Sequence, residues 1–160
     1  MQNGPELGYQ GRYNELESLV PESFNIPIIS QVLLGRHWRD IDEEARNHFT
    51  KLYESLIIAT YASRFKEYDG ENFILKGVEE LNRGRILVKT ELQPDSGETV
   101  TLDYLMDNRN DRWWIISVIA NGVNDISLKR AEYADVIKIR GYDALLEEIK
   151  NKIHNLAEPA

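Results

Sequence analysis

The side chains that most often carry catalysis or bind metals are few and scattered in this 160-residue chain. Its three histidines, His37, His48 and His154, have no His or Cys partner at a metal-ligand spacing such as H-E-x-x-H. His37, in the stretch GRHWRD, could be a general base, but a lone His beside Trp38 near a helix boundary is more often a packing or hydrogen-bonding residue. We therefore expect neither a metal site nor histidine chemistry.

Motifs that activate a nucleophile or hold a nucleotide do not occur in the sequence either. It contains no G-x-S-x-G, no G-x-G-x-x-G, no Walker phosphate loop and no cysteine. Carboxylates are plentiful, but pairs such as Glu43-Glu44 and Glu147-Glu148 are adjacent, and neighbours on a helix diverge by about 100 degrees. Asp103 lies in a predicted strand, where alternation points it outward to water. The sequence thus predicts a non-enzymatic protein without cofactors.

Composition and charge restrict the class of partner. The chain is 42% hydrophobic and 29% charged, and no window approaches the ~20 uninterrupted apolar residues of a membrane span. A formal charge of -8 would repel phosphate backbones and anionic membrane surfaces, so we expect no nucleic-acid partner. The length predicts a single soluble domain, residues 1–160. The start MQNGPELGYQG shows no intact signal peptide, which fits either a cytosolic protein or a mature exported one.

The elements that must position any site begin with helices over about residues 9–68. We expect two short helices between Tyr9 and Leu34, interrupted at Pro21 and Pro27. A longer amphipathic helix should begin at Asp40, as N-cap, and run to about Tyr68, before Asp69-Gly70. Two further helices are predicted at residues 125–140 and 142–156, divided at Gly141.

Between these helical regions, over about residues 71–120, the hydrophobic period changes from 3.6 to 2. Turn signals at residues 82–84, 94–97 and 107–111 divide this segment into four strands. The connections are only a few residues long, so the strands should pair antiparallel. We predict an α+β fold in which helices pack on one side of a four-stranded twisted antiparallel sheet.

The last strand, RWWIISVIANG, is apolar on both faces. Alternation places Trp113 and Ile115 on one face with Ser117, and Trp114 and Ile116 on the other. A strand of a one-layer sheet normally has one wet face, so something other than water should cover the second side. One explanation is a β-bulge near Ser117 that exchanges the inward residues, combined with a central place in the sheet. The other is a bound apolar ligand.

Three stretches bear on the second explanation: LGRHWRDIDEEARNHFTKLYESLIIATYASRF, VTLDYLMDNRNDRWWIISVIANGV and ISLKRAEYADVIKIRGYDALLEEIKNKI. In them, and in their order over nearly the whole chain, the sequence resembles the MlaC family, also called the toluene-tolerance or ABC-transporter auxiliary family. The closing run VNDISLKRAEYADVIKIRGYDALL is similar to the HpnM branch, whose genes are associated with hopanoid synthesis. Ser117 and Asn121 stand where phospholipid-type members often have acids, so contacts that use those acids are not carried over.

The resemblance implies a fold that encloses a lipid cavity between sheet and helices, and a periplasmic location after loss of a signal peptide. It implies a monomer that shuttles phospholipid or a hopanoid-like lipid between the outer and inner membranes. The implied partners are an inner-membrane ABC lipid transporter and an outer-membrane complex. A long acyl chain would bind such a cavity strongly, since each buried methylene contributes about 0.8 kcal/mol. The candidate lipid-binding residues are Val88, Val100, Leu102, Tyr104, Met106, Trp113 and Ile115 from the strands and Tyr53, Leu56, Ile57 and Tyr61 from the long helix.

Two rival functions remain at this stage. The first is an isomerase- or dehydratase-like enzyme acting on a hydrophobic substrate in the same cavity. It is disfavoured because Tyr104 is the one obvious titratable group at the predicted inward positions. The second is a structural interaction domain whose second apolar face forms a dimer interface.

Overall fold

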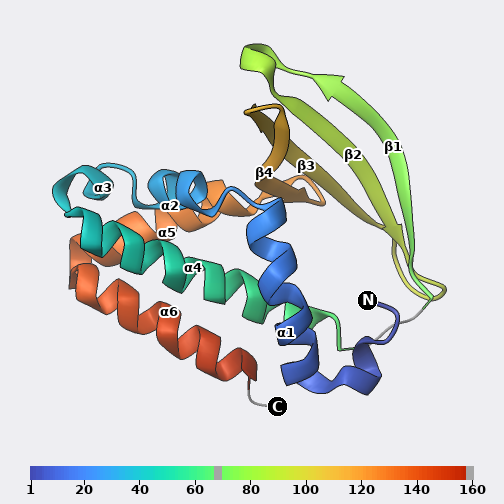
Figure 1. Cartoon of the computed structure of the whole chain (residues 1–160), viewed down its shortest axis with the longest axis horizontal. Coiled ribbons are helices and arrows are strands. Elements are labelled where there is room, and N and C mark those ends of the chain that lie inside the picture. Colours follow the sequence, from blue (N-terminus) through green and yellow to red (C-terminus); the bar gives the residue numbers. More distant parts are fainter. Residues whose placement is uncertain (67–69, 158–160) are drawn as a thin grey trace.

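The computed structural model describes residues 1–66 and 70–157 of the chain. In chain order the elements are α1 (Gly4–Ser23), α2 (Ile26–Leu34), α3 (His37–Asp40), α4 (Glu43–Arg64), β1 (Asn72–Glu80), the 3-10 turn η1 (Asn82–Gly84), β2 (Ile86–Gln93), β3 (Val100–Arg109), β4 (Arg112–Ala120), β5 (Val123–Asn124), α5 (Asp125–Arg140) and α6 (Tyr142–Ala157). Helices and strands are segregated in space, and the sheet rises at an angle from one end of the helical layer (Figure 1).

The sheet is an antiparallel meander in the order β1-β2-β3-β4-β5. The β3–β4 hairpin turns at Asn110 and Asp111, whose φ angles of 53° and 60° suit the two-residue turns that match strand twist. The predicted α+β class is confirmed, but the sheet has five strands rather than four. The fifth is two residues long and leads into α5, where the Asn124 side chain accepts a hydrogen bond from the Ser127 N–H at 3.2 Å.

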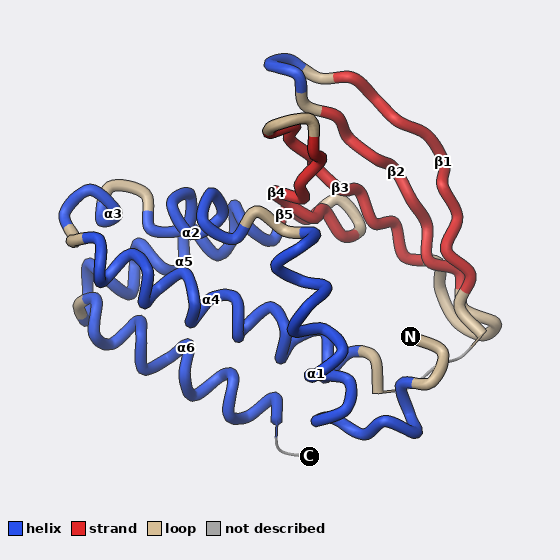
Figure 2. The backbone as a smooth tube through the Cα atoms, in the orientation of Figure 1, coloured by secondary structure: helices blue, strands red, loops and turns tan. Residues whose placement is uncertain are grey.

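The helices pack chiefly on one another. Their shared core contains fully buried side chains from three helices, among them Leu33 of α2, Phe49 of α4 and Leu145 of α6. The helices that touch the sheet most, α1, α2 and α5, do so through β4. Figure 2 shows the consequence, with β1 and β2 lying farthest from the helices.

Several predicted helix boundaries are wrong. The long helix begins at Glu43, because Asp42 rather than Asp40 is the N-cap and accepts the Ala45 N–H at 2.8 Å. It ends at Arg64, and the predicted end at Tyr68 and Asp69 lies outside the described residues.

The N-terminal helices also differ from the prediction. α1 begins at Gly4, bends at Gly8 and runs through Pro21, which occupies its last turn. The break comes at Phe24, after which Asn25 caps α2 and Pro27 fits its first turn. The short α3 was not predicted. In contrast, the observed α5 and α6, and the Gly141 that separates them, match the prediction to within one residue.

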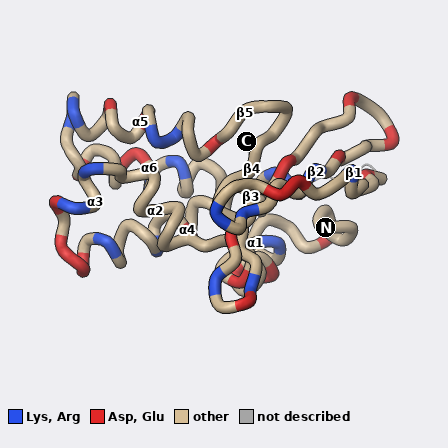
Figure 3. Tube along the Cα trace, turned by 90° about the horizontal axis from the view of Figure 1, so that it is seen from above, with Lys and Arg blue, Asp and Glu red and all other residues tan. Residues whose placement is uncertain are grey.

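Figure 3 shows acidic and basic residues interspersed over both layers. No helix in residues 1–66 or 70–157 is both long and apolar enough to cross a membrane.

Candidate functional site

Strand register determines which side chains share the inner face of the sheet, the face turned toward α4. Between β2 and β3, Thr90 lies opposite Leu102 and Leu92 lies opposite Val100. Opposite residues point to the same face, so the predicted rows on these two strands are correct. Thr90 is the polar residue in this apolar row. Its hydroxyl is satisfied, because Oγ1 donates a hydrogen bond to the Leu102 carbonyl oxygen at 2.6 Å.

A β-bulge exchanges the inward positions of β4. Leu105 lies opposite Ser117, but the next residue, Met106, lies opposite Ile115, so Ile116 is the extra residue. This is the irregularity predicted near Ser117, and it explains why the strand is apolar on both sides. The central placement predicted with it is wrong over most of β4. β5 pairs only with Ile119 and Ala120, the last two residues of β4. The connection between α1 and α2 contacts β4 at Ile115, where the Asn25 N–H donates to the Ile115 carbonyl oxygen at 2.9 Å.

A cavity of about 630 Å³ lies between the inner face of the sheet and the C-terminal end of α4. This volume is within the 300–1,000 Å³ range typical of small-molecule sites. Most of the lining is apolar. The lining residues are Met1, Gln2, Tyr61, Arg64, Phe65, Glu71, Phe73, Leu92, Val100, Leu102, Tyr104, Val118, Ala120, Val123 and Asp125.

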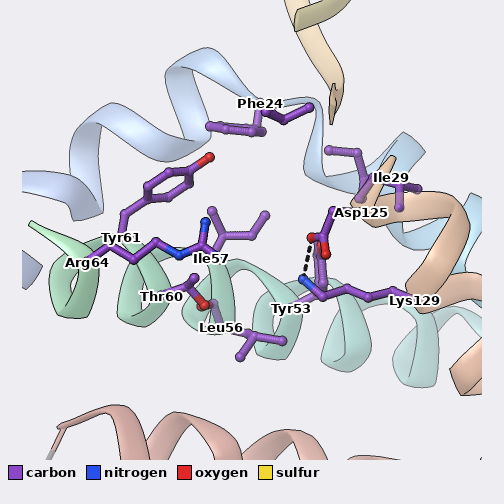
Figure 4. A pocket seen from close by; sticks show the side chains of 12 residues that line it. Phe24, Ile29, Tyr53, Leu56, Ile57, Thr60, Tyr61, Arg64, Asp125 and Lys129 are labelled. Carbon is purple, nitrogen blue, oxygen red and sulfur yellow. Dashed lines mark hydrogen bonds and ion pairs between the residues drawn. The ribbon is translucent and has the colours of Figure 1, made fainter. Parts of the chain in front are cut away.

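A second, smaller cavity of about 60 Å³ adjoins the first, deeper against the helices (Figure 4). Its wall includes the predicted helix residues Tyr53, Leu56 and Ile57, together with Phe24 and Ile29. Tyr61, Arg64, Val118 and Asp125 line both cavities. The two cavities therefore share part of their wall, and the sheet forms another part of the wall of the larger one.

The structure brings together part of the predicted site. Val100, Leu102, Tyr104 and Tyr61 line the larger cavity, and Tyr53, Leu56 and Ile57 line the smaller one. Val88, Met106, Trp113 and Ile115 line neither. Their register places all four on the same face. Met106, Ile115 and Trp113 lie beyond Tyr104 along the strands, whereas Val88 lies opposite Tyr104.

Ionisable groups at the cavity are more numerous than the sequence predicted. Besides Tyr104, the lining includes Arg64, Glu71 and Asp125. Asp125 is paired with Lys129, whose Nζ lies 2.7 Å from the carboxylate, and Lys129 also lies over the ring of Tyr53 (Figure 4). The prediction that Tyr104 would be the one obvious titratable group is therefore wrong.

The pKa values of the cavity tyrosines reflect how far the cavity wall excludes water. Burial, with a smaller contribution from nearby Tyr61, raises the pKa of Tyr104 to about 12. Burial also raises the pKa of Tyr61, and the adjacent Arg64 guanidinium opposes that rise. Both phenols therefore stay protonated at neutral pH. Neither is a ready general base.

Some of the missed residues could have been found from sequence. Leu92 continues the row of Thr90 on β2, and Phe73 lies opposite Leu92 on β1. Val118 and Ala120 become inward only because of the bulge. Arg64 and Asp125 carry no local signal, since they come from the end of one helix and the start of another.

A metal centre finds no support in the residues that the structure describes. Among residues 1–66 and 70–157, no three His, Asp or Glu side chains form a group that could hold a metal ion. The site is a largely apolar cavity with a few charged groups at its border with the helices.

Comparisons with known proteins agree with this geometry. The family model described as "MlaC protein" matches residues 1–151. The toluene tolerance protein ttg2D of Pseudomonas putida is 21% identical over 116 residues, which are 72% of this chain and 54% of that protein. The chain thus spans about half the length of this curated relative.

A solved structure has the same fold. It is a phospholipid-binding protein from Ralstonia solanacearum in complex with a phospholipid, with a TM-score of 0.82 and 22% sequence identity. The match covers 98% of this chain and 90% of the other.

Proposed function

This chain belongs to the MlaC family, and from that premise we propose that it binds lipid in the larger cavity and carries it through an aqueous compartment. The ligand is a phospholipid or a hopanoid-like lipid, with its tails inside and its polar end near solvent. The similarity to a phospholipid-bound protein supports the phospholipid, and the likeness of the closing run to the HpnM branch supports the hopanoid.

The observation that carries this proposal is an apolar inner sheet face that the chain does not fill. Phe73, Leu75 and Val78 of β1 have exposed fractions of 57%, 64% and 56%. Their partners on β2, Leu92, Thr90 and Val88, share the same face. Phe73 and Leu92 line the larger cavity, and the other four extend this face beyond it. Apolar surface left open to water is unfavourable by about 25 cal/mol per Å², so a ligand that covers it binds without any specific polar contact.

We propose a non-catalytic role. The cavity has ionisable side chains, among them Arg64 and Glu71, but Asp125 is ion-paired with Lys129, Glu71 also has an interaction partner, and the phenols of Tyr61 and Tyr104 remain protonated. The enzyme alternative requires a group that abstracts or donates a proton at neutral pH. Membership of a family with a lipid-binding relative of the same fold supports transport instead.

The family also supports a location and a set of partners. We propose that the protein works in the periplasm as a monomer, between an inner-membrane ABC lipid transporter and an outer-membrane complex. Organic extraction of freshly purified protein, followed by lipid mass spectrometry and by uptake from phospholipid vesicles, tests the binding function. We expect a substantial fraction of one lipid per chain. Protein that contains no lipid and takes none up from vesicles would overturn the proposal.

A further inference from the structure

The side chain of Arg64 is a cation in the wall that the two cavities share. Arg64 is the last residue of α4 and one of the four residues that line both cavities. In Figure 4 its side chain extends along α4 toward the cavity, beside Tyr61 and above Thr60. The guanidinium lies close enough to the Tyr61 phenol to oppose the rise in its pKa that burial causes. Arg64 is thus placed at the border between apolar cavity and solvent.

Among the residues that the structure describes, no ion pair involves Arg64, although Arg85, Arg109 and Arg140 each have an acidic partner. The other cation at the cavities, Lys129, is paired with Asp125 at 2.7 Å. Arg36, Arg39 and other arginines of the described part also have no ion pair, so Arg64 is distinguished by its place beside a largely apolar cavity.

The chemistry of the guanidinium indicates which ligand group Arg64 would bind. Arginine presents a planar fork of donors that fits two oxygens of a phosphate, and such charge-assisted bonds are about twice as strong as neutral ones. A lipid whose tails enter the larger cavity must leave its phosphate at the border, because burying an unpaired phosphate would be very unfavourable. Arg64 lies at that border and is exposed, so the remainder of the headgroup can stay in water.

We propose that Arg64 binds the phosphate of a glycerophospholipid whose acyl chains occupy the larger cavity, and that it thereby selects phosphate-bearing lipids over neutral ones. This inference rests on the proposed lipid-binding function and makes it more specific. The acyl chains supply most of the affinity through apolar burial, and Arg64 supplies the discrimination. A neutral hopanoid would gain nothing from this residue.

The test compares two ligands with the same acyl chains, one with a phosphoglycerol headgroup and the other with a free hydroxyl in its place. Phosphatidylglycerol and diacylglycerol carrying the same fluorescent acyl chain are offered in vesicles to wild-type protein, Arg64→Gln, Arg64→Lys and the control Arg36→Gln. Arg36 is also an exposed arginine, but it precedes α3, at the opposite end of the helical layer from the cavity (Figure 1). Circular dichroism melting on the same samples verifies folding.

We expect Arg64→Gln to weaken phosphatidylglycerol binding about tenfold, with diacylglycerol binding unchanged. Arg64→Lys should restore part of the loss, because it keeps the charge without the fork. The control should bind both lipids like wild type. Glycerol phosphate, which lacks acyl chains, should not compete, because the tails complete the site.

The outcomes separate the two proposals. If wild-type protein binds neither lipid, the lipid-binding function itself fails. If wild type binds both and Arg64→Gln leaves phosphatidylglycerol binding unchanged, or weakens both lipids equally, lipid binding stands and the assignment of Arg64 is overturned. Competition by glycerol phosphate at the concentration of the lipid would overturn the assignment to a lipid phosphate.

Discussion

The helical layer and the sheet both present apolar side chains to the interior, but the helices bury far more of theirs. Phe49 and Leu145 of the helical core are 0% exposed, whereas Phe73 and Leu75 on the inner face of β1 are more than half exposed. Among the described residues, Ile116 at the bulge is the one apolar side chain of the sheet that is classed with the buried core. The helices are stabilised by packing on one another. The apolar side chains on the inner face of β1 are not covered by other described residues, which fits a face that a bound lipid covers.

The largest expected effect comes from placing a charge in the helical core. Leu145→Asp would bury a carboxylate with no partner among Phe49, Tyr53 and their neighbours, at a cost of several kcal/mol. We expect insoluble or unfolded protein, measured by circular dichroism and soluble yield. Soluble, natively folded Leu145→Asp would contradict the view that the helical layer is a closely packed core.

The same charge on the sheet should separate binding from folding. Leu102→Asp or Tyr104→Asp should abolish lipid uptake while the protein stays folded, because cavity water can solvate the carboxylate once lipid is absent. Melting and lipid transfer are measured on the same samples. The control is Thr101→Asp, on the opposite face of β3, which should keep both properties. Unfolding of both inward variants beside a native control would show that this face is ordinary core.

The same substitution, Leu to Ala, in each layer compares how much the two layers contribute to the free energy of unfolding. Leu145→Ala should lower the free energy of unfolding by about 2–5 kcal/mol, because it opens a hole in a filled core. Leu102→Ala, on a face that borders a cavity, should lower it by less than about 1.5 kcal/mol, since little packing is lost. Urea unfolding of the lipid-free variants measures both. Equal losses would remove the distinction between the two layers.

The smallest effect concerns the ionisation of Tyr104. Its pKa, raised to about 12 from an ordinary value of 10.0, should rise further when lipid displaces water from the cavity. Because the folded state holds this proton more tightly than the unfolded state, the associated stability is present below pH 10 and is lost as the pH rises from 10 to about 12. Tyrosinate absorbance of wild type minus Tyr104→Phe, with and without lipid, measures the shift. No change on lipid loading would place Tyr104 outside the ligand's contact.

Much of the fold could be predicted because its signals are local. The turns at residues 82–84 and 94–97 and the division at Gly141 come from residues whose backbone preferences act within a few positions. The boundaries that went wrong involve competition between neighbours. Asp42 and Asp40 are both good caps, and only the placement of α3 leaves Asp42 free to cap α4. Pro21 is tolerated because it falls in the last turn of α1.

The site was predictable where it depends on alternation along one strand. Val100, Leu102 and Tyr104 share a face by the period of a β-strand, and that face borders the cavity. Alternation cannot say where along the strand the cavity ends. Met106 follows the same rule as Tyr104 and lies outside it.

The sequence alone determined which side chains share a face on β2 and β3 and that the sheet is an antiparallel meander, because these follow from local periodicity and turn residues. It offered the bulge in β4 only as one of two explanations. Tertiary structure alone decided how far the helices cover the sheet and which charged groups reach the cavity. Arg64 and Asp125 lie far apart in the chain, and they line the same two cavities with Val118 only because β4 leads through β5 into α5. Such an arrangement depends on the packing of whole elements, which no short stretch of sequence records.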